Sequence, residues 1–123
     1  MKALHTDLAP AAVGPYSQAM EAGGFVFVSG QIGLLPGTGE LAESFAAQAE
    51  QAIRNVGEIL RAAGLDYGDV VKTTCYLADI RAFSAFNAVY EKYFTGKPAR
   101  SLIQAAALPR GALVEVEAIA AGR

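Results

Sequence analysis

The strongest constraint on the fold of this 123-residue chain is that several predicted strands are apolar on both faces. In FVFVSG, at residues 25–30, two phenylalanines alternate with two valines, so both faces of a strand would carry apolar side chains. LVEVEAIA, at residues 113–120, has small apolar residues on one side and Leu113 and Ile119 on the other. Because an uncovered apolar face promotes association, we expect a closed homo-oligomer. The alternative is a monomer whose loops cover that face.

Two helices are predicted. Between Ser44 and Ala63, apolar residues recur at three- and four-residue steps behind a capping serine. A second helix is expected over residues 80–94, with Asp79 as its cap. Both are amphipathic, so each should cover a sheet with its apolar stripe.

The predicted strands complete an α+β domain that spans residues 1–123. Two short strands flank a turn at Gly23-Gly24, and further strands are expected at 70–77, near 101–106 and near 113–120. The resulting order is β-β-α-β-α-β-β, with both helices on one face of a mixed sheet.

Composition excludes several classes of function. The net charge of −2 offers no basic surplus for nucleic acid, and no segment reads as a signal peptide or membrane span. Cys75 is the only cysteine and His5 the only histidine, so neither a disulfide nor a zinc cluster is expected. We expect a cytoplasmic protein with no metal and no membrane partner.

Arg100 and Glu115 interrupt apolar, strand-like runs and are candidates for chemistry. A guanidinium binds a carboxylate or phosphate through two parallel hydrogen bonds, and a carboxylate can orient a water and move protons. The anion bound by Arg100 could instead be Glu115 or Glu117 of the same chain. The two glutamates could also form a solvated strand face.

Three further residues have structural explanations of their own. Ser29 ends a strand, where its hydroxyl would bond to backbone groups, and Tyr16 follows a Gly-Pro turn, where it would pack at an interface. Cys75 lies among β-branched residues and is expected to be a buried small hydrophobe.

Seven segments, in order, resemble the reactive intermediate deaminase family, also called Rid, YjgF or the L-PSP endoribonuclease and translation-inhibitor family. The resemblance covers nearly the whole chain. The segments are APAAVGPYSQA (9–19), VSGQIGLLPGTGE (28–40), QAEQAIRNVGEILRAAG (48–64), VVKTTCYLADI (70–80), FNAVYEKYF (86–94), PARS (98–101) and LPRGALVEVEAIA (108–120).

The resemblance implies a chorismate-mutase-like fold and a homotrimer whose sheets face inward, with sites between subunits. It also implies hydrolytic deamination of reactive 2-imino and enamine acids, such as 2-aminoacrylate, to 2-keto acids and ammonia. No metal or organic cofactor is used in that reaction. The expected partners are small 2-imino and 2-keto carboxylates.

Site residues carry over from the resemblance by position. Arg100 in PARS would bind the substrate carboxylate, and Glu115 in VEVEAIA would position the attacking water and handle protons. Tyr16 in GPY and Ser29 in SGQ would complete the pocket wall, and Asn87 in FNAVY would support it. Glu117 would then lie outside the reacting shell.

Two departures from the family pattern bear on substrate range. Leu102 stands where many relatives have a cysteine, and Lys97 lies in a connection shorter than usual. Two other functions are compatible with the sequence. One is the endoribonuclease or translation-inhibitor activity attributed to some relatives, and the other is a trimer that binds small carboxylates without turning them over.

Overall fold

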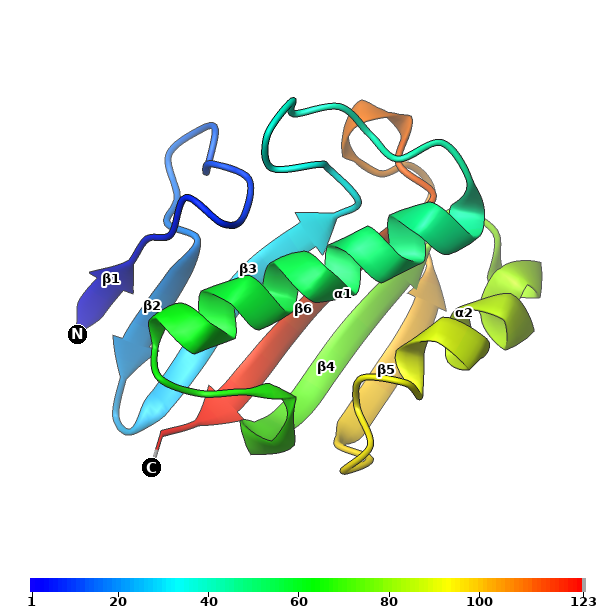
Figure 1. The fold of residues 1–123 in the computed structure, drawn as a ribbon. Helices are drawn as coiled ribbons and strands as arrows, with labels where there is room; N and C mark the ends of the chain where they lie inside the picture. The colour runs from blue at the N-terminus through cyan, green and yellow to red at the C-terminus, as the bar shows by residue number, and fades with distance from the viewer. Residues whose placement is uncertain (123) are drawn as a thin grey trace.

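A computed structural model describes residues 1–122 and contains one six-stranded mixed sheet, with two helices on one face (Figure 1). The strand order is β1-β2-β3-β6-β4-β5, and only β4 and β5 pair in parallel. Within these residues, no helix is long and apolar enough to cross a membrane. The elements are β1 (Lys2–Leu4), β2 (Ala19–Ala22), β3 (Phe25–Ile32), α1 (Phe45–Ala62), β4 (Val70–Leu77), α2 (Phe83–Tyr90), β5 (Ala99–Gln104) and β6 (Val114–Ala121).

The predicted α+β architecture is confirmed, with differences at element ends. The Gly23-Gly24 hairpin joins β2 to β3, and Ser44 caps α1 by accepting a hydrogen bond from the Ala47 backbone N–H. The three-residue strand β1 was not predicted, because so short a segment shows no alternation. It is a strand only through its antiparallel pairing with β2.

The second helix is shorter than the predicted 80–94. Asp79 does act as a cap, but of a single 3₁₀ turn, and α2 covers only Phe83–Tyr90. Beyond Tyr90 the chain continues in turns, and Phe94 still reaches the core with 2% of its surface exposed. The apolar residues at helical spacing therefore correctly indicated burial as far as Phe94, but not the end of the helix at Tyr90.

The helices cover one face of the sheet, whereas the other face is apolar and exposed, as the strand patterns predicted. Helix α1 packs on β3 and β6, where Val114 and Val116 are fully buried. On the other face Phe25, Phe27 and Ile103 are 43–48% exposed. One chain thus covers only the helix side of its sheet and leaves an apolar open face.

Asn55 joins α1 to the chain that leaves β3. Its side chain is fully buried and donates to the carbonyls of Ile32 (3.2 Å) and Leu34 (2.9 Å). Gly33, between those carbonyls, lies so close to α1 that an added Cβ would be 2.6 Å from the Gln48 backbone. These contacts fix where β3 ends.

We predict that Asn55→Ala lowers the free energy of unfolding by about 2–3 kcal/mol, since it leaves two carbonyls without their buried donor. Gln51→Ala removes only the half-buried donor to the Asn55 side chain and should cost less than about 1 kcal/mol. Urea denaturation of both variants at one protein concentration measures the difference. Equal losses would show that the Asn55 contacts do not anchor this segment.

Candidate functional site

Three of the five predicted site residues line one pocket of about 560 Å³ at the end of β3. Tyr16 comes from the loop before β2, Ser29 from β3 and Glu115 from β6. Apolar residues 10–13 and Leu34 form much of the remaining wall. A small apolar hollow with a few polar groups is the usual form of a small-molecule site.

An irregularity in β3 places Ser29 and Gly30 beside Glu115. The pairing of β3 with β6 shifts register between Val28 and Gln31, which bends the strand there. The Ser29 hydroxyl donates to the Ser17 carbonyl (2.6 Å), so the serine does bond to backbone, although its oxygen can still accept. The Glu115 carboxylate lies directly over Gly30, where an added Cβ would be 2.0 Å from Oε2.

The Tyr16 loop is held by Gln18, whose side chain is almost fully buried. Its amide accepts from the Thr6 N–H (2.7 Å) and donates to the carbonyls of Thr6 (3.1 Å) and Pro10 (2.8 Å). The loop is thereby tied to the N-terminal segment, and the Tyr16 side chain is left 53% exposed at the pocket.

Glu115 is half-buried and makes no ion pair within residues 1–122. Burial, and then the nearby charge of Glu117, raise the pKa of its carboxyl above the usual value. A carboxyl with a raised pKa and no counter-ion is suited to accept a proton and release it again.

Arg100 and Asn87 lie together elsewhere. Arg100 donates to the Asn87 side-chain oxygen (2.8 Å), and its guanidinium lies 4.8 Å from the centre of the Tyr90 ring. In the described chain it has no carboxylate partner, so the alternative in which it pairs with Glu115 or Glu117 is wrong. Its side chain is exposed and open to an external anion.

Arg100 and Glu115 point to opposite faces of the sheet. Arg100 pairs with Thr73, which is buried on the helix side and hydrogen-bonded to Tyr90 of α2 (2.7 Å). Glu115 alternates with residues buried under α1 and therefore faces the open side. The structure thus brings Tyr16, Ser29 and Glu115 together but leaves Arg100 and Asn87 outside their pocket.

Among the pocket residues that were not predicted as members of the site, Gly30 and Arg110 bear most on its geometry. Gly30 could not be recognised from the sequence, because the need for glycine there comes from the Glu115 carboxylate, which occupies the space of a side chain. Arg110 lines the pocket from a left-handed backbone conformation (φ 59°) and donates to the Gly39 carbonyl (2.9 Å). The Pro-Arg-Gly turn was visible in the sequence, but its position beside the pocket was not.

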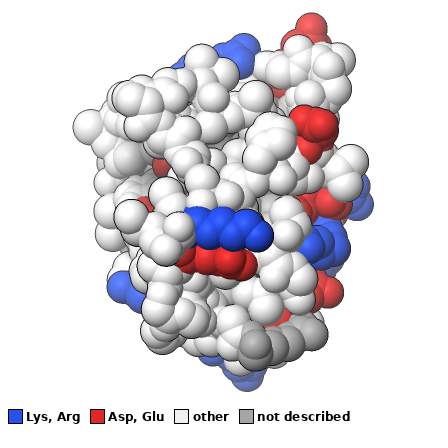
Figure 2. All heavy atoms as spheres, turned by 90° about the vertical axis from the view of Figure 1, so that its left-hand side faces the viewer, with Lys and Arg blue, Asp and Glu red and all other residues white. Residues whose placement is uncertain are grey.

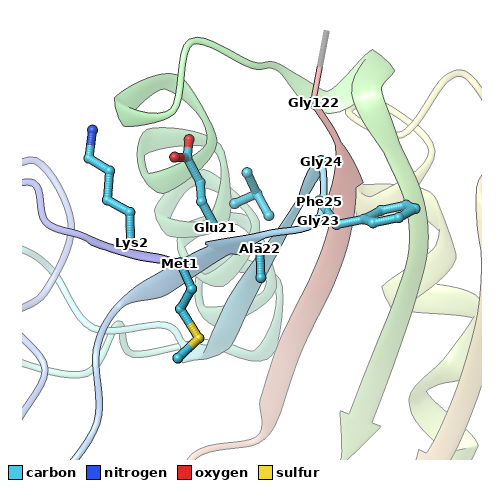
Figure 3. Close-up of a pocket in the computed structure, with 9 residues that line it drawn as sticks. Met1, Lys2, Glu21, Ala22, Gly23, Gly24, Phe25 and Gly122 are labelled. Carbon is cyan, nitrogen blue, oxygen red and sulfur yellow. The ribbon is translucent and has the colours of Figure 1, made fainter.

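Other candidate groups offer no reactive centre. Burial raises the pKa of the Cys75 thiol to about 11, which fits the predicted inert hydrophobe. Within residues 1–122, no group of three or more His, Cys, Asp or Glu could hold a metal ion. A second hollow, of about 300 Å³, lies by the hairpin, where Lys2 and Glu21 point to the same side (Figure 3). It contains none of the predicted site residues.

Comparison with known proteins gives consistent matches. Residues 6–122 match the family model described as endoribonuclease L-PSP. A mouse protein named 2-iminobutanoate/2-iminopropanoate deaminase is 51% identical over 121 residues, which are 97% of this chain and 90% of that protein. Two E. coli crystal structures, of the YjgF gene product and of TdcF with bound serine, superpose over the full length of both chains. Each has a TM-score of 0.96, at 46% and 40% identity.

We predict that Gly30→Ala moves the Glu115 carboxylate out of its place, since the new methyl group would occupy that space. The carboxylate is the end of a flexible side chain, so the free energy of unfolding should change by no more than about 1 kcal/mol. Gly37→Ala is the matched control, because a Cβ there meets nothing within 4 Å. A crystal structure of each variant tests this, and a Glu115 carboxylate that keeps its place in Gly30→Ala would refute it.

Proposed function

Because this chain belongs to the endoribonuclease L-PSP family, also called Rid or YjgF, we propose that it hydrolyses reactive 2-imino and enamine acids to 2-keto acids and ammonia. Substrates of the size of 2-aminoacrylate and its imine suit a hollow of about 560 Å³ with one proton-handling group. The observation that carries the proposal is the Glu115 carboxyl, which lies in the pocket beside Ser29 and Tyr16 without a counter-ion in the described chain.

In the proposed mechanism the substrate supplies the electrophile. Protonation of an enamine at carbon gives an iminium, whose C2 is open to attack by water. Arg100, oriented by Asn87, binds the substrate carboxylate through its free N–H groups. Holding the carboxylate and the water in register supplies much of the acceleration, because it removes the entropic cost of their meeting.

Glu115 is assigned the proton transfers. Its carboxylate accepts a proton from water as the oxygen bonds to C2 and the C=N electron pair moves to nitrogen. The acid then returns that proton to the amine. The C–N bond breaks to release ammonia, while the hydroxyl oxygen forms the keto C=O bond and gives up its proton to the ammonia. Tyr16 and Ser29 complete the wall around these atoms.

We propose further that the complete site lies between subunits of a homotrimer. Arg100 and Glu115 face opposite sides of one sheet, so a substrate that touches both needs them from different chains. A contact between unlike surfaces of identical chains is head-to-tail, and such contacts form a closed ring when the rotation between neighbouring chains closes. The apolar open face around Phe25, Phe27 and Ile103 supports burial between subunits, and the number three follows from the family resemblance.

The two other functions have less support. RNA cleavage would call for a basic surface, whereas the net charge is −2 and the side in Figure 2 is largely uncharged, with acidic and basic groups interspersed. A trimer that only binds carboxylates would have Glu115 turned away from the pocket or paired with a cation. Instead, the Glu115 side chain lines the pocket.

We predict that the protein speeds keto acid release from imino acids, and that Arg100→Ala lowers kcat/KM at least about 100-fold by removing the carboxylate anchor. An amino-acid oxidase with catalase generates the imines in place, and semicarbazide traps what remains. Arg81→Ala removes an exposed arginine that pairs with Asp79 and is the matched control. Clearance that is equal in wild type and Arg100→Ala would exclude Arg100 as the anchor, and no clearance by the wild type would reject the hydrolase.

A further inference from the structure

Glu117 is a half-buried acid that the proposed reaction does not use. It lies two residues after Glu115 on β6, so the two carboxyl groups share the open face of the sheet. From this geometry we propose that Glu117 is a positioning residue. Fixed by Tyr76, it keeps a negative charge beside Glu115 and so holds the Glu115 carboxyl ready to take up and return a proton.

Tyr76 of β4 fixes the position of Glu117. Its hydroxyl donates to Glu117 Oε1 at 2.5 Å, a short and charge-assisted hydrogen bond. This bond raises the pKa of Tyr76 to about 12, so the phenol remains a donor across the neutral range. Tyr76 is also the β4 residue directly paired with Glu115, and its hydroxyl reaches across to Glu117, two residues further along β6.

Among residues 1–122, no positively charged group forms an ion pair with Glu115. Of the groups that face it, β6 contributes Glu117, β4 contributes Tyr76, and β3 contributes the uncharged Ser29 and Gly30. Lys72 follows on the same face one pair beyond Glu117, and it forms no ion pair with either acid. Tyr16 and Arg110 line the pocket, but neither contributes to the raised pKa of Glu115, which comes from burial and Glu117.

A like charge beside a carboxyl disfavours its ionised form, and the effect is strongest where water is partly excluded. For imine hydrolysis, a stronger base accepts the proton of water more readily, and the same group must then act as an acid. The Tyr76–Glu117 pair would thus serve the reaction without touching substrate, and this role rests on the proposed function. A purely structural role would leave the titration of Glu115 unchanged.

The test is the titration of Glu115 followed by carbon-13 NMR of protein labelled at the glutamate carboxyl carbon. Its resonance is assigned through its loss in Glu115→Gln. Removing the neighbouring charge in Glu117→Gln should lower the midpoint of Glu115 by about 0.5–1 pH unit. Glu117→Asp keeps the charge and should leave the midpoint near that of wild type. Glu91→Gln removes an exposed charge after α2 and is the control for net charge.

The rate of imine clearance provides a second readout. The carboxylate acts as the base, so activity is lost as pH falls through the pKa of Glu115. In Glu117→Gln this acidic limb should move to lower pH by the same amount as the NMR midpoint. A Glu115 midpoint that is unchanged in Glu117→Gln would overturn the inference, whether or not imines are hydrolysed. An absence of hydrolysis by the wild type would instead reject the proposed function.

Discussion

Alternation along the strands of a sheet covered on one side determines where each polar residue of this chain can act. Side chains that face α1 and α2 enter the core, and those on the other side reach the open apolar face. Arg100 and Glu115 differ in this assignment, and no rotamer change carries either one through the sheet. A small substrate can touch both only if a second chain supplies one of them. Burial of the exposed phenylalanines on the open face would favour such an association.

The pocket itself depends on a few local departures from regular structure. The register shift in β3 and the missing side chain of Gly30 make room for the Glu115 carboxylate. Asn55 and Gly33 fix the point at which the chain leaves β3, and Gln18 fixes the loop that bears Tyr16. Each uses buried hydrogen bonds or close backbone contact, interactions that tolerate little displacement. The position of the pocket walls is therefore fixed by buried hydrogen bonds that lie outside the pocket.

Much of this could be predicted from the sequence, because it follows from periodicity. The capped helix α1, the Gly23-Gly24 hairpin and the twice-apolar strands are properties of residues near one another in the chain. The partners of Arg100 could not be predicted, since its hydrogen bond to Asn87 spans 13 residues and depends on where α2 ends. Likewise, the fit of Glu115 over Gly30 needs the β3–β6 register, which alternation alone does not give.

The most direct test of a site shared between chains is complementation between two inactive variants. Arg100→Ala and Glu115→Gln would be produced with different tags, and oligomers that carry both tags would be isolated. A closed trimer that carries both variants has one interface in three that combines an intact Arg100 with an intact Glu115, so about a third of wild-type imine hydrolysis should return. Mixed oligomers no more active than the separate variants would contradict the shared site.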